Sequence, residues 1–389
     1  MSKNIGAIIV SQLNHTNYGS FLQAYATINF VKNLGYNLSI IHYKKKRSIK
    51  DWIKIGPKLL ISGGLESLQI SFKRKFQEKK YTTYKPNQKI RIEATNKLKY
   101  KEFIPLVKEY IGFDNLREGS KKFNLVFVGS DQVWKPWGFY SYYWNLLFVD
   151  EQVPKFSYAS SFGVSKIPWI QKKGTKKYLE RLNMISVREI QGKNIVETLS
   201  NKYAELVVDP TMLLTPEEWR NFYSDSSINL PKEKYIFCYF LGKREEGRIE
   251  ALKFAKENNL KIVIMRHMDE YVPIEENMGD YAPYDVNGKD FLKLLDNAEY
   301  VLTDSFHGTV FSILFHKNFI TFYRQKQKSI ISTNNRIDSL LTNFNLTNRI
   351  YKGNLFLEIT NKINFEIVDE LRTKLCQDSK KFFEKCLKL

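Results

Sequence analysis

Residues 5–43 decide the fold, and they read IGAIIVSQLNHTNYGSFLQAYATINFVKNLGYNLSIIHY. The β-rich apolar run at 5–10 predicts a strand, and a polar loop follows it. Apolar side chains then recur at helical spacing from Ser20 to Leu34, Gly35 ends the helix, and residues 38–43 form a second β-rich run. We interpret this stretch as a βαβ unit, which predicts two parallel strands joined by a helix that covers them.

The same alternation continues along the rest of the chain. Further strands are predicted at 125–128, 155–160, 185–187 and 206–208, and then at 235–241, 261–265, 300–302 and 318–323. Short apolar runs bounded by turns are typical of parallel sheets that are buried on both faces. We therefore predict an α/β fold with two Rossmann-like doubly wound domains and a ligand in the cleft between them.

A polar segment interrupts the alternation of predicted strands and helices. It begins around Asp209-Pro210 and extends to Lys234, and we interpret it as the hinge between the domains. The predicted N-terminal domain is 1–210, and it contains a basic helical insertion at about 44–115. The predicted C-terminal domain is 211–355, and 356–389 is a helical tail.

Composition excludes several classes of protein. The chain has 389 residues, of which 43% are apolar and 26% charged, which is typical of a globular protein with sizeable cores. Its three cysteines show no CxxC spacing, which argues against a disulfide framework and a zinc site, and no HExxH motif is present. No apolar run is long enough to span a membrane, and the N-terminus does not resemble a signal peptide. We expect a cytoplasmic protein without a bound metal.

The positive charge is concentrated in one segment. The chain carries a net charge of +20, and residues 44–110 contain 19 lysines and arginines against six acids. The runs at 44–47 and 72–76 mix cations with apolar residues, which suits an anionic membrane face. A solvated helical face explains the same charge equally well. Nucleic acid is the weakest alternative because no recognised nucleic-acid-binding motif occurs, so we expect no nucleic-acid partner.

The sharpest local signal is YVLTDSFHGTVFS at 300–312, a strand followed by a small-residue turn and an apolar helix. A helix that begins here offers free backbone N–H groups to a phosphate, with Ser305, Gly308 and Thr309 at hand. His307 lies at the mouth of this turn, and imidazole is suited to proton transfer near neutral pH. The alternative is structural: Ser305 or Thr303 caps the helix and His307 only packs. We favour function.

A second loop between a strand and a helix contains the sequence Asn17-Tyr18-Gly19-Ser20. Gly19 permits close approach of a ligand to the backbone, and Ser20 is a candidate helix cap. A single glycine is also common in such turns, so binding and turn geometry remain equal alternatives for these four residues.

Two more strands end in polar residues. In VGSDQVW at 128–134, Asp131 is a candidate acceptor of a hydroxyl proton, and Trp134 looks exposed and able to stack on a sugar ring. The alternative for Asp131 is a turn cap. At the end of 185–187, Arg188 offers a planar set of donors to a carboxylate or phosphate, and the alternative is an ion pair with Glu189 or another nearby acid.

Taken together, six motifs resemble the polysaccharide pyruvyl transferase family, and they follow the family's order along residues 5–350. They are NYGSxLQAYA (17–26), VGSDQVW (128–134), SYASSFG (157–163), SVRExxG (186–192), VVDPTMLL (207–214) and TDSFHGTVFS (303–312). The resemblance implies a fold similar to the GT-B glycosyltransferases. It also implies transfer of the enolpyruvyl group of phosphoenolpyruvate onto two hydroxyls of a sugar, forming a pyruvate ketal.

The resemblance also implies roles for individual residues. His307 becomes the general acid, Arg188 the partner of the donor's carboxylate or phosphate, and Gly308 with Thr309 the phosphate seat, while Asp131 or Asp304 is the base. No cofactor is implied, and the acceptor is a sugar or a lipid-linked oligosaccharide at the inner membrane face.

One departure separates this chain from the family pattern. Other members carry an arginine two residues before the histidine, where this chain has Ser305. Arg266, Arg324 or Arg336 are candidates for supplying that charge from a neighbouring loop, and we favour Arg336. Two alternatives remain open: a GT-B-like glycosyltransferase that uses a nucleotide-sugar, and a non-enzymatic scaffold of polysaccharide assembly at the membrane.

Overall fold

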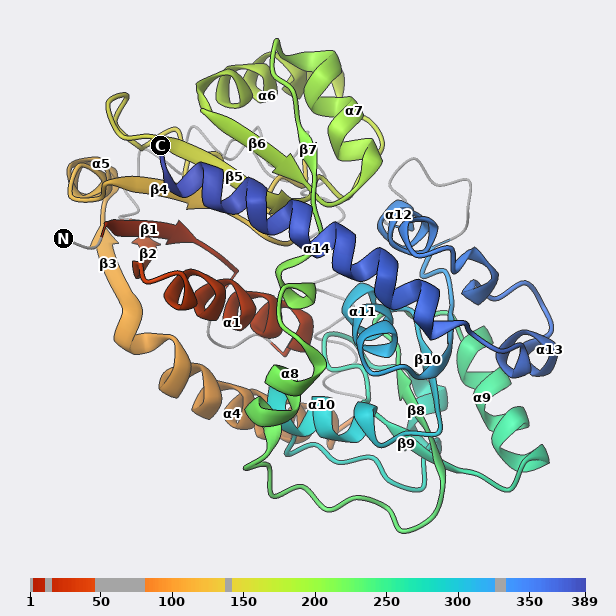
Figure 1. Cartoon of the computed structure of the whole chain (residues 1–389). Coiled ribbons are helices and arrows are strands. Elements are labelled where there is room, and N and C mark those ends of the chain that lie inside the picture. The colour runs from red at the N-terminus through yellow and green to blue at the C-terminus, as the bar shows by residue number, and fades with distance from the viewer. Residues whose placement is uncertain (1–2, 11–15, 46–80, 137–141, 326–333) are drawn as a thin grey trace.

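Seven parallel strands form the first sheet of the computed structural model, which describes residues 3–10, 16–45, 81–136, 142–325 and 334–389 (Figure 1). Their order is β3-β2-β1-β4-β5-β6-β7, and every neighbouring pair is parallel. The strands are β1 (Asn4–Ile8), β2 (Asn37–Lys44), β3 (Val107–Ile111), β4 (Leu125–Val128), β5 (Lys155–Ser160), β6 (Met184–Val187) and β7 (Glu205–Leu206).

The second sheet has four parallel strands in the order β11-β10-β8-β9. They are β8 (Tyr235–Tyr239), β9 (Lys261–Ile264), β10 (Tyr300–Thr303) and β11 (Asn318–Thr321). The central strands β4 and β8 are fully buried, as expected for a sheet that helices cover on both faces. The predicted α/β fold with two Rossmann-like halves is confirmed.

One strand of the first sheet lies where the sequence predicts only a helical insertion. Strand β3 reads VKEYI, and its side chains are exposed or half-buried. An edge strand buries little apolar surface, so it lacks the apolar run by which the other strands are recognised. The basic run at 72–76 lies outside the described residues, together with residues 46–71 and 77–80 of the basic segment.

Helices connect and cover the strands, and local signals explain several of their boundaries. In the first half they are α1 (Tyr18–Asn33), α4 (Tyr84–Glu102), α5 (Phe113–Ser120), α6 (Trp169–Arg181) and α7 (Ile190–Leu199). The Asn17 side chain caps α1 by accepting from the Ser20 N–H at 3.3 Å. Gly35, with φ +81°, follows the end of α1.

The second half contains α8 (Pro216–Tyr223), α9 (Glu246–Glu257), α10 (Gly288–Asp296), α11 (Phe306–Leu314), α12 (Asn335–Asn343) and α13 (Leu355–Thr360). Capping boxes start two of them, formed by Thr215 with Glu218 and by Asn287 with Asp290.

The last helix, α14 (Phe365–Leu387), returns from the second half and crosses the first (Figure 1). Its Phe383 ring packs against Phe127 and Tyr158 of the first sheet, with centroid distances of 5.5 and 4.7 Å. Its Ser379 hydroxyl accepts from the Val208 N–H at 3.0 Å. The helix therefore ties the segment after β7 to the first sheet.

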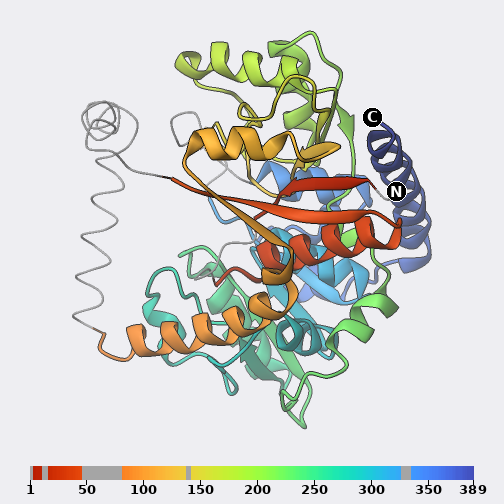
Figure 2. The same cartoon turned by 90° about the vertical axis from the view of Figure 1, so that its left-hand side faces the viewer.

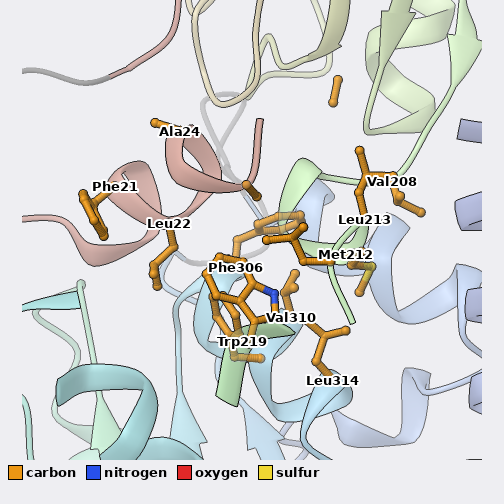
Figure 3. Packing of buried hydrophobic residues seen from close by; sticks show 14 of the residues in the cluster. Phe21, Leu22, Ala24, Val208, Met212, Leu213, Trp219, Phe306, Val310 and Leu314 are labelled. Carbon is orange, nitrogen blue, oxygen red and sulfur yellow. The ribbon is translucent and has the colours of Figure 1, made fainter. Parts of the chain in front are cut away.

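Two further helices join the halves. Helix α1 packs against α8, α10 and α11, so that one core extends through both halves, and Figure 3 shows side chains of α1, α8 and α11 meeting there. Helix α4 reaches the second half, as Figure 2 shows. Its buried Arg91 donates to the carbonyls of Tyr284 at 2.8 Å and Pro283 at 2.7 Å.

Candidate functional site

The candidate site forms where the carboxyl ends of strands from both sheets meet. Asp131 follows β4, Arg188 follows β6, Asp209 follows β7, and His307 follows β10 of the second sheet. The carboxyl ends of parallel strands lie at one edge of a sheet, so residues far apart in the sequence converge there. The structure thus brings together three residues singled out from the sequence, His307, Arg188 and Asp131, and adds Asp209.

Asp209 is the centre of this cluster. Its side chain is 1% exposed. Oδ2 accepts from the Arg188 guanidinium at 2.6 Å and from the Ser130 hydroxyl at 3.0 Å. Oδ1 accepts from the N–H and hydroxyl of Thr211 at 3.1 and 2.8 Å. Burial by itself raises the pKa of Asp209, but His307 and Arg188 outweigh it and hold the pKa well below its usual range. Asp209 therefore stays ionised.

His307 is the second residue of α11, and its imidazole reaches back toward the first half. Nε2 lies 3.6 Å from Oδ2 of Asp209. Nε2 is buried and has no hydrogen-bond partner among the described residues. On the other side, a Cβ added at Gly19 would overlap Nδ1 of His307. The glycine at the start of α1 is therefore what allows the ring to sit between the two halves.

Arg188 already has acidic partners. Its 1% exposed side chain donates to Asp209 at 2.6 Å and to Asp131 at 3.0 Å, and its Nε lies 3.9 Å from Glu189. Burial lowers the pKa of Arg188, but Asp131 and the other acids raise it above its usual value. Two N–H groups of the guanidinium donate to carboxylates. The ion-pair alternative therefore describes Arg188 better than the prediction that it binds the carboxylate or phosphate of the substrate. Arg188 fixes Asp131 and Asp209 relative to each other.

Asp131 presents its carboxylate from a turn with φ +74°. Oδ1 accepts from Arg188, and Oδ2 accepts from the Ser20 hydroxyl at 2.9 Å. Burial raises the pKa of Asp131, but Arg188, His307 and Arg336 together lower it to about 2. Ser20, predicted as a helix cap or ligand contact, therefore links α1 to this carboxylate.

Arg336 is a buried cation next to the cluster. It lies over the Phe306 ring at 5.7 Å, and Arg188 lies over the same ring at 4.4 Å. The Gln132 amide, oriented with its oxygen toward Arg336, accepts from Nε and Nη2 at 2.9 Å. Burial and the positive charge of Arg188 lower the pKa of Arg336 to about 9, so it is still protonated at neutral pH. The Gln132 amide carries no charge, so the negative charge that acts on Arg336 comes from Asp131 and Glu189, which raise its pKa against these effects.

Several predicted site residues have structural partners instead. The Ser305 hydroxyl caps α11 by accepting from the Gly308 N–H at 3.3 Å, and the Ser305 carbonyl accepts from the Thr309 N–H at 2.9 Å. The two N–H groups predicted to seat a phosphate are therefore occupied by the cap. The buried Thr309 hydroxyl contacts Thr321 at 2.9 Å. A Cβ at Gly308 would lie 2.6 Å from Oγ1 of Thr303, so this glycine serves close helix-to-strand packing.

The expectation that Trp134 is exposed is wrong. The side chain packs against Phe162 and Tyr178, and its Nε1 donates to the Trp144 carbonyl at 3.2 Å. The indole completes the apolar core below the loop, so it offers no open face to a sugar.

Tyr18 and Asp304 also have structural hydrogen-bond partners. The Tyr18 hydroxyl donates to the Val286 carbonyl at 3.0 Å, and its ring stacks on Phe291, so it joins the two halves. The Asp304 carboxylate accepts from the N–H groups of Leu241 and Gly242 at 2.6 and 2.7 Å. Asp304 thus braces the loop after β8.

The other two candidate arginines, Arg324 and Arg266, have partners in the second half of the chain. Arg324 donates to the Asp304 carbonyl at 3.2 Å, and its Nε is buried without a partner among the described residues. Arg266 donates to the carbonyls of Glu275 and Glu276 and to the Tyr284 hydroxyl, at the carboxyl end of β9.

Asp209 is the residue that the sequence reasoning did not assign to the site. Its signal was present: an aspartate follows a predicted strand and precedes a proline, where a side chain commonly caps a turn. Asp209 does cap the short 3₁₀ helix Pro210–Met212. Only the packing of β7 beside β6 brings the same carboxylate to Arg188 and His307.

Within the described residues, no group of three or more histidine, cysteine or acidic side chains is arranged to hold a metal ion. The three cysteines are free and buried. No helix in the described ranges is long and apolar enough to cross a membrane.

Comparisons with known proteins agree with this geometry. The UDP-GlcNAc 2-epimerase of Neisseria meningitidis, solved with UDP-GlcNAc, has a similar structure with a TM-score of 0.53 and 10% identity, covering 99% of both chains. The UDP-N-acetylglucosamine 2-epimerase of Rickettsia bellii gives a TM-score of 0.50 and 9% identity, covering 100% of this chain and 98% of that one. These similarities support the two-domain GT-B-like fold.

No curated protein matches the sequence. The model of the family described as "Polysaccharide pyruvyl transferase" matches residues 17–326, a span that contains Gly19, Asp131, Arg188, Asp209 and His307 but ends before Arg336. Because this match covers most of the chain, the protein belongs to the polysaccharide pyruvyl transferase family and is a transferase.

Proposed function

We propose that the protein transfers the enolpyruvyl group of phosphoenolpyruvate onto two hydroxyls of a sugar in a polysaccharide precursor, forming a pyruvate ketal. The observation that carries the proposal is the pair His307 and Asp209, which joins the two halves at the carboxyl ends of their strands. An imidazole beside an ionised carboxylate is suited to deliver a proton and to hold the positive charge before delivery.

The first step is protonation of C3 of phosphoenolpyruvate by the His307 imidazolium. The proton joins the CH₂ carbon to make a methyl group, and positive charge develops at C2. The Asp209 carboxylate orients the ring and stabilises its protonated form, while Arg188 holds Asp209 in place. His307 is thus the acid, and Asp209 and Arg188 are positioning residues.

A sugar hydroxyl then attacks C2 and releases its proton. The C2–O bond to phosphate breaks, inorganic phosphate leaves with the bonding electron pair, and a second hydroxyl closes the ketal ring. The two hydroxyl protons balance the proton that C3 gains and the proton that leaves with phosphate. We assign Asp131 rather than Asp304 as the base, because Arg188 links Asp131 to Asp209 beside His307, whereas Asp304 braces the loop after β8.

A group of cations beside the pair suits the anionic donor. Other members of the family carry an arginine at the position of Ser305. We infer that Arg336 supplies this positive charge here. Burial lowers the pKa of Lys135, and the positive charges of Arg336 and Arg324 lower it further. The three cations therefore lie close together. Such a group attracts a carboxylate and a phosphate and stabilises charge that develops on the departing phosphate.

The acceptor and its location follow from the same chemistry. We propose that the sugar is part of a cell-surface polysaccharide precursor, free or linked to a lipid, that the enzyme meets on the cytoplasmic side of the membrane. Phosphoenolpyruvate is then the only further substrate, and no cofactor takes part in the steps above.

The experiment is incubation of the protein with labelled phosphoenolpyruvate and a panel of sugar acceptors. We expect phosphate release that depends on acceptor, transfer of label to the sugar, and loss of both in His307→Gln with the melting temperature kept. Release of phosphate by His307→Gln at the wild-type rate would overturn the assignment of the acid.

A nucleotide-sugar donor is the second candidate. Ser305, where other members have arginine, favours it, because the cap of α11 leaves no cation at that position. The same panel with nucleotide-sugars separates the two: release of a nucleoside diphosphate without any reaction of phosphoenolpyruvate would replace the first proposal.

A further inference from the structure

Large apolar side chains are exposed along the carboxyl edge of the first sheet. Ile111 ends β3, Phe113 begins α5, and Tyr142 contacts Phe113 with a centroid distance of 5.7 Å. These side chains are 52%, 37% and 56% exposed. Figure 2 shows that β2 runs toward the side of the molecule on which α4 and α5 begin. Asp131, Arg188 and Asp209 of the candidate site follow strands that end at this same edge.

The most exposed of these side chains lie at the start of α6. Trp169 is 83% exposed and Ile170 is 57% exposed. The helix itself is firmly placed, because Leu179 is fully buried and Tyr178 packs on Trp134 with a centroid distance of 5.5 Å. The Gln171 amide donates to the Pro136 carbonyl at 2.8 Å, in the loop that follows Asp131. The apolar pair is therefore held rigidly beside the site loop.

Lysines lie close to this pair in the sequence. Exposed ones lie just before α6 and on its first three turns: Lys166, Lys172, Lys173, Lys176 and Lys177. At the carboxyl end of β2, Lys44 is the last residue of the strand and Lys45 follows it, and both are exposed. The exposed Glu180, the acid within α6, lies 3.6 Å from Lys176. The side chains at the start of α6 therefore lie in a field of positive charge, whereas those at the end of β3 and the start of α5 have exposed residues of both signs beside them, among them Glu109 and Asp114. We call Ile111, Phe113, Tyr142, Trp169 and Ile170 the apolar rim.

We propose that the apolar rim docks the protein on an anionic lipid bilayer. Tryptophan is enriched at the level of lipid headgroups, and nearby lysines are attracted to anionic headgroups. Exposed apolar patches with a polar border mark sites that bind proteins or membranes. Docking by this edge turns the carboxyl ends of the strands, and with them the site, toward the membrane. The proposal does not depend on which donor the enzyme uses.

The test is flotation of the full chain with vesicles of phosphatidylcholine alone or mixed with phosphatidylglycerol. We expect binding to the mixed vesicles at about 0.1 M salt and its loss at about 1 M salt, where screening is short-ranged. The double variant Trp169→Ala and Ile170→Ala is expected to bind at least about tenfold more weakly, since both side chains enter the interface. Each lysine among Lys172, Lys173 and Lys177 changed to glutamine is expected to weaken binding about fivefold.

A matched control exists on α13, where Phe356 and Leu357 are adjacent and 50% and 65% exposed. Changing both to alanine is expected to leave vesicle binding unchanged. Activity of the Trp169 and Ile170 variant on a soluble acceptor is expected to stay at the wild-type level, because neither residue belongs to the site.

Three results would overturn the proposal. One is equal binding to neutral and anionic vesicles, and another is unchanged binding of the double variant. The third is a wild-type protein that binds no vesicles and forms a dimer that dissociates on Trp169→Ala. The rim would then be an interface between two copies of the chain.

Discussion

Nε2 of His307 lies 3.6 Å from Oδ2 of Asp209, and these two atoms connect the second sheet to the strand that ends the first. The same Asp209 oxygen accepts from Arg188 at 2.6 Å. One buried carboxylate therefore holds the proposed acid and a guanidinium in a single cluster. The predictions below test what each member contributes.

Replacing Asp209 by asparagine removes the charge beside His307 while keeping the shape of the side chain. We expect kcat to fall about 10²- to 10⁴-fold, the range in which general acid catalysis contributes. Arg188 also loses one acidic partner, so the melting temperature is measured together with kcat. Asp296→Asn, which alters an acid bound by Arg220 and Tyr223 outside the cluster, is the control and is expected to keep full activity. Wild-type kcat in Asp209→Asn would show that the carboxylate plays no part.

Gly19→Ala tests the close approach of α1 to the imidazole. The new Cβ overlaps Nδ1 of His307, so the ring has to move away from Asp209. We expect kcat to fall at least about tenfold, since small displacements of catalytic groups are costly. Gly35→Ala, at the other end of α1, meets no atom within 4 Å. It costs about 1 kcal/mol of stability because φ is positive there, and it should leave kcat unchanged. Equal kcat in both variants would contradict the prediction.

Arg336→Gln removes the cation that we assign to the anionic donor. A hydrogen bond to a charged group contributes about 1.5–3 kcal/mol, so KM for phosphoenolpyruvate is expected to rise about 10- to 100-fold. Arg266→Gln is the comparison, because that guanidinium donates to the Glu275 and Glu276 carbonyls. If Arg266→Gln raises KM and Arg336→Gln does not, the donor lies at the end of β9.

Arg91→Met tests how α4 holds the second half. The variant loses both donors to the Tyr284 and Pro283 carbonyls. We expect the free energy of unfolding to fall by about 3 kcal/mol, measured in urea. Arg220→Met is the surface control, since its side chain is 45% exposed, and it is expected to cost less than about 1 kcal/mol. Similar losses in the two variants would show that the α4 contacts are no stronger than a surface ion pair.

Acid sensitivity follows from Asp131. Its pKa in the folded protein is about 2, below the value of about 3.9 for a free aspartate. The folded state therefore favours the ionised form, so this stability is present above the unfolded pKa and is lost as the pH falls toward 2. We expect Asp131 to contribute about 2 kcal/mol to the fall in the free energy of unfolding between about pH 5 and pH 2.

The measurement is urea unfolding at several pH values in this window. Asp131→Asn should show a shallower pH dependence, whereas Glu257→Gln on the exposed side of α9 should match the wild type. A wild-type slope in Asp131→Asn would mean that this carboxylate has an ordinary pKa.

Much of the fold was predictable because its signals are local. Strands β4 and β5 have the bounds that the sequence predicts, 125–128 and 155–160. The edge strand β3 was missed because none of its side chains is fully buried and two adjacent charged residues, Lys108 and Glu109, interrupt its apolar residues. Trp134 was misplaced for the opposite reason: its neighbours in the sequence are polar, while Phe162 and Tyr178, which bury it, come from other segments.

For the site, the sequence by itself determined which side chains stand at the ends of strands, and therefore at which edge of each sheet they lie. Only the tertiary structure decided their partners. Arg188 pairs with Asp131 and Asp209, Ser305 caps its helix, and His307 sits between Gly19 and Asp209. Strand ends are set by short-range periodicity, whereas ion pairs depend on how strands order within a sheet and how two halves pack. Those distances of a few ångströms have no counterpart in residue spacing along the chain.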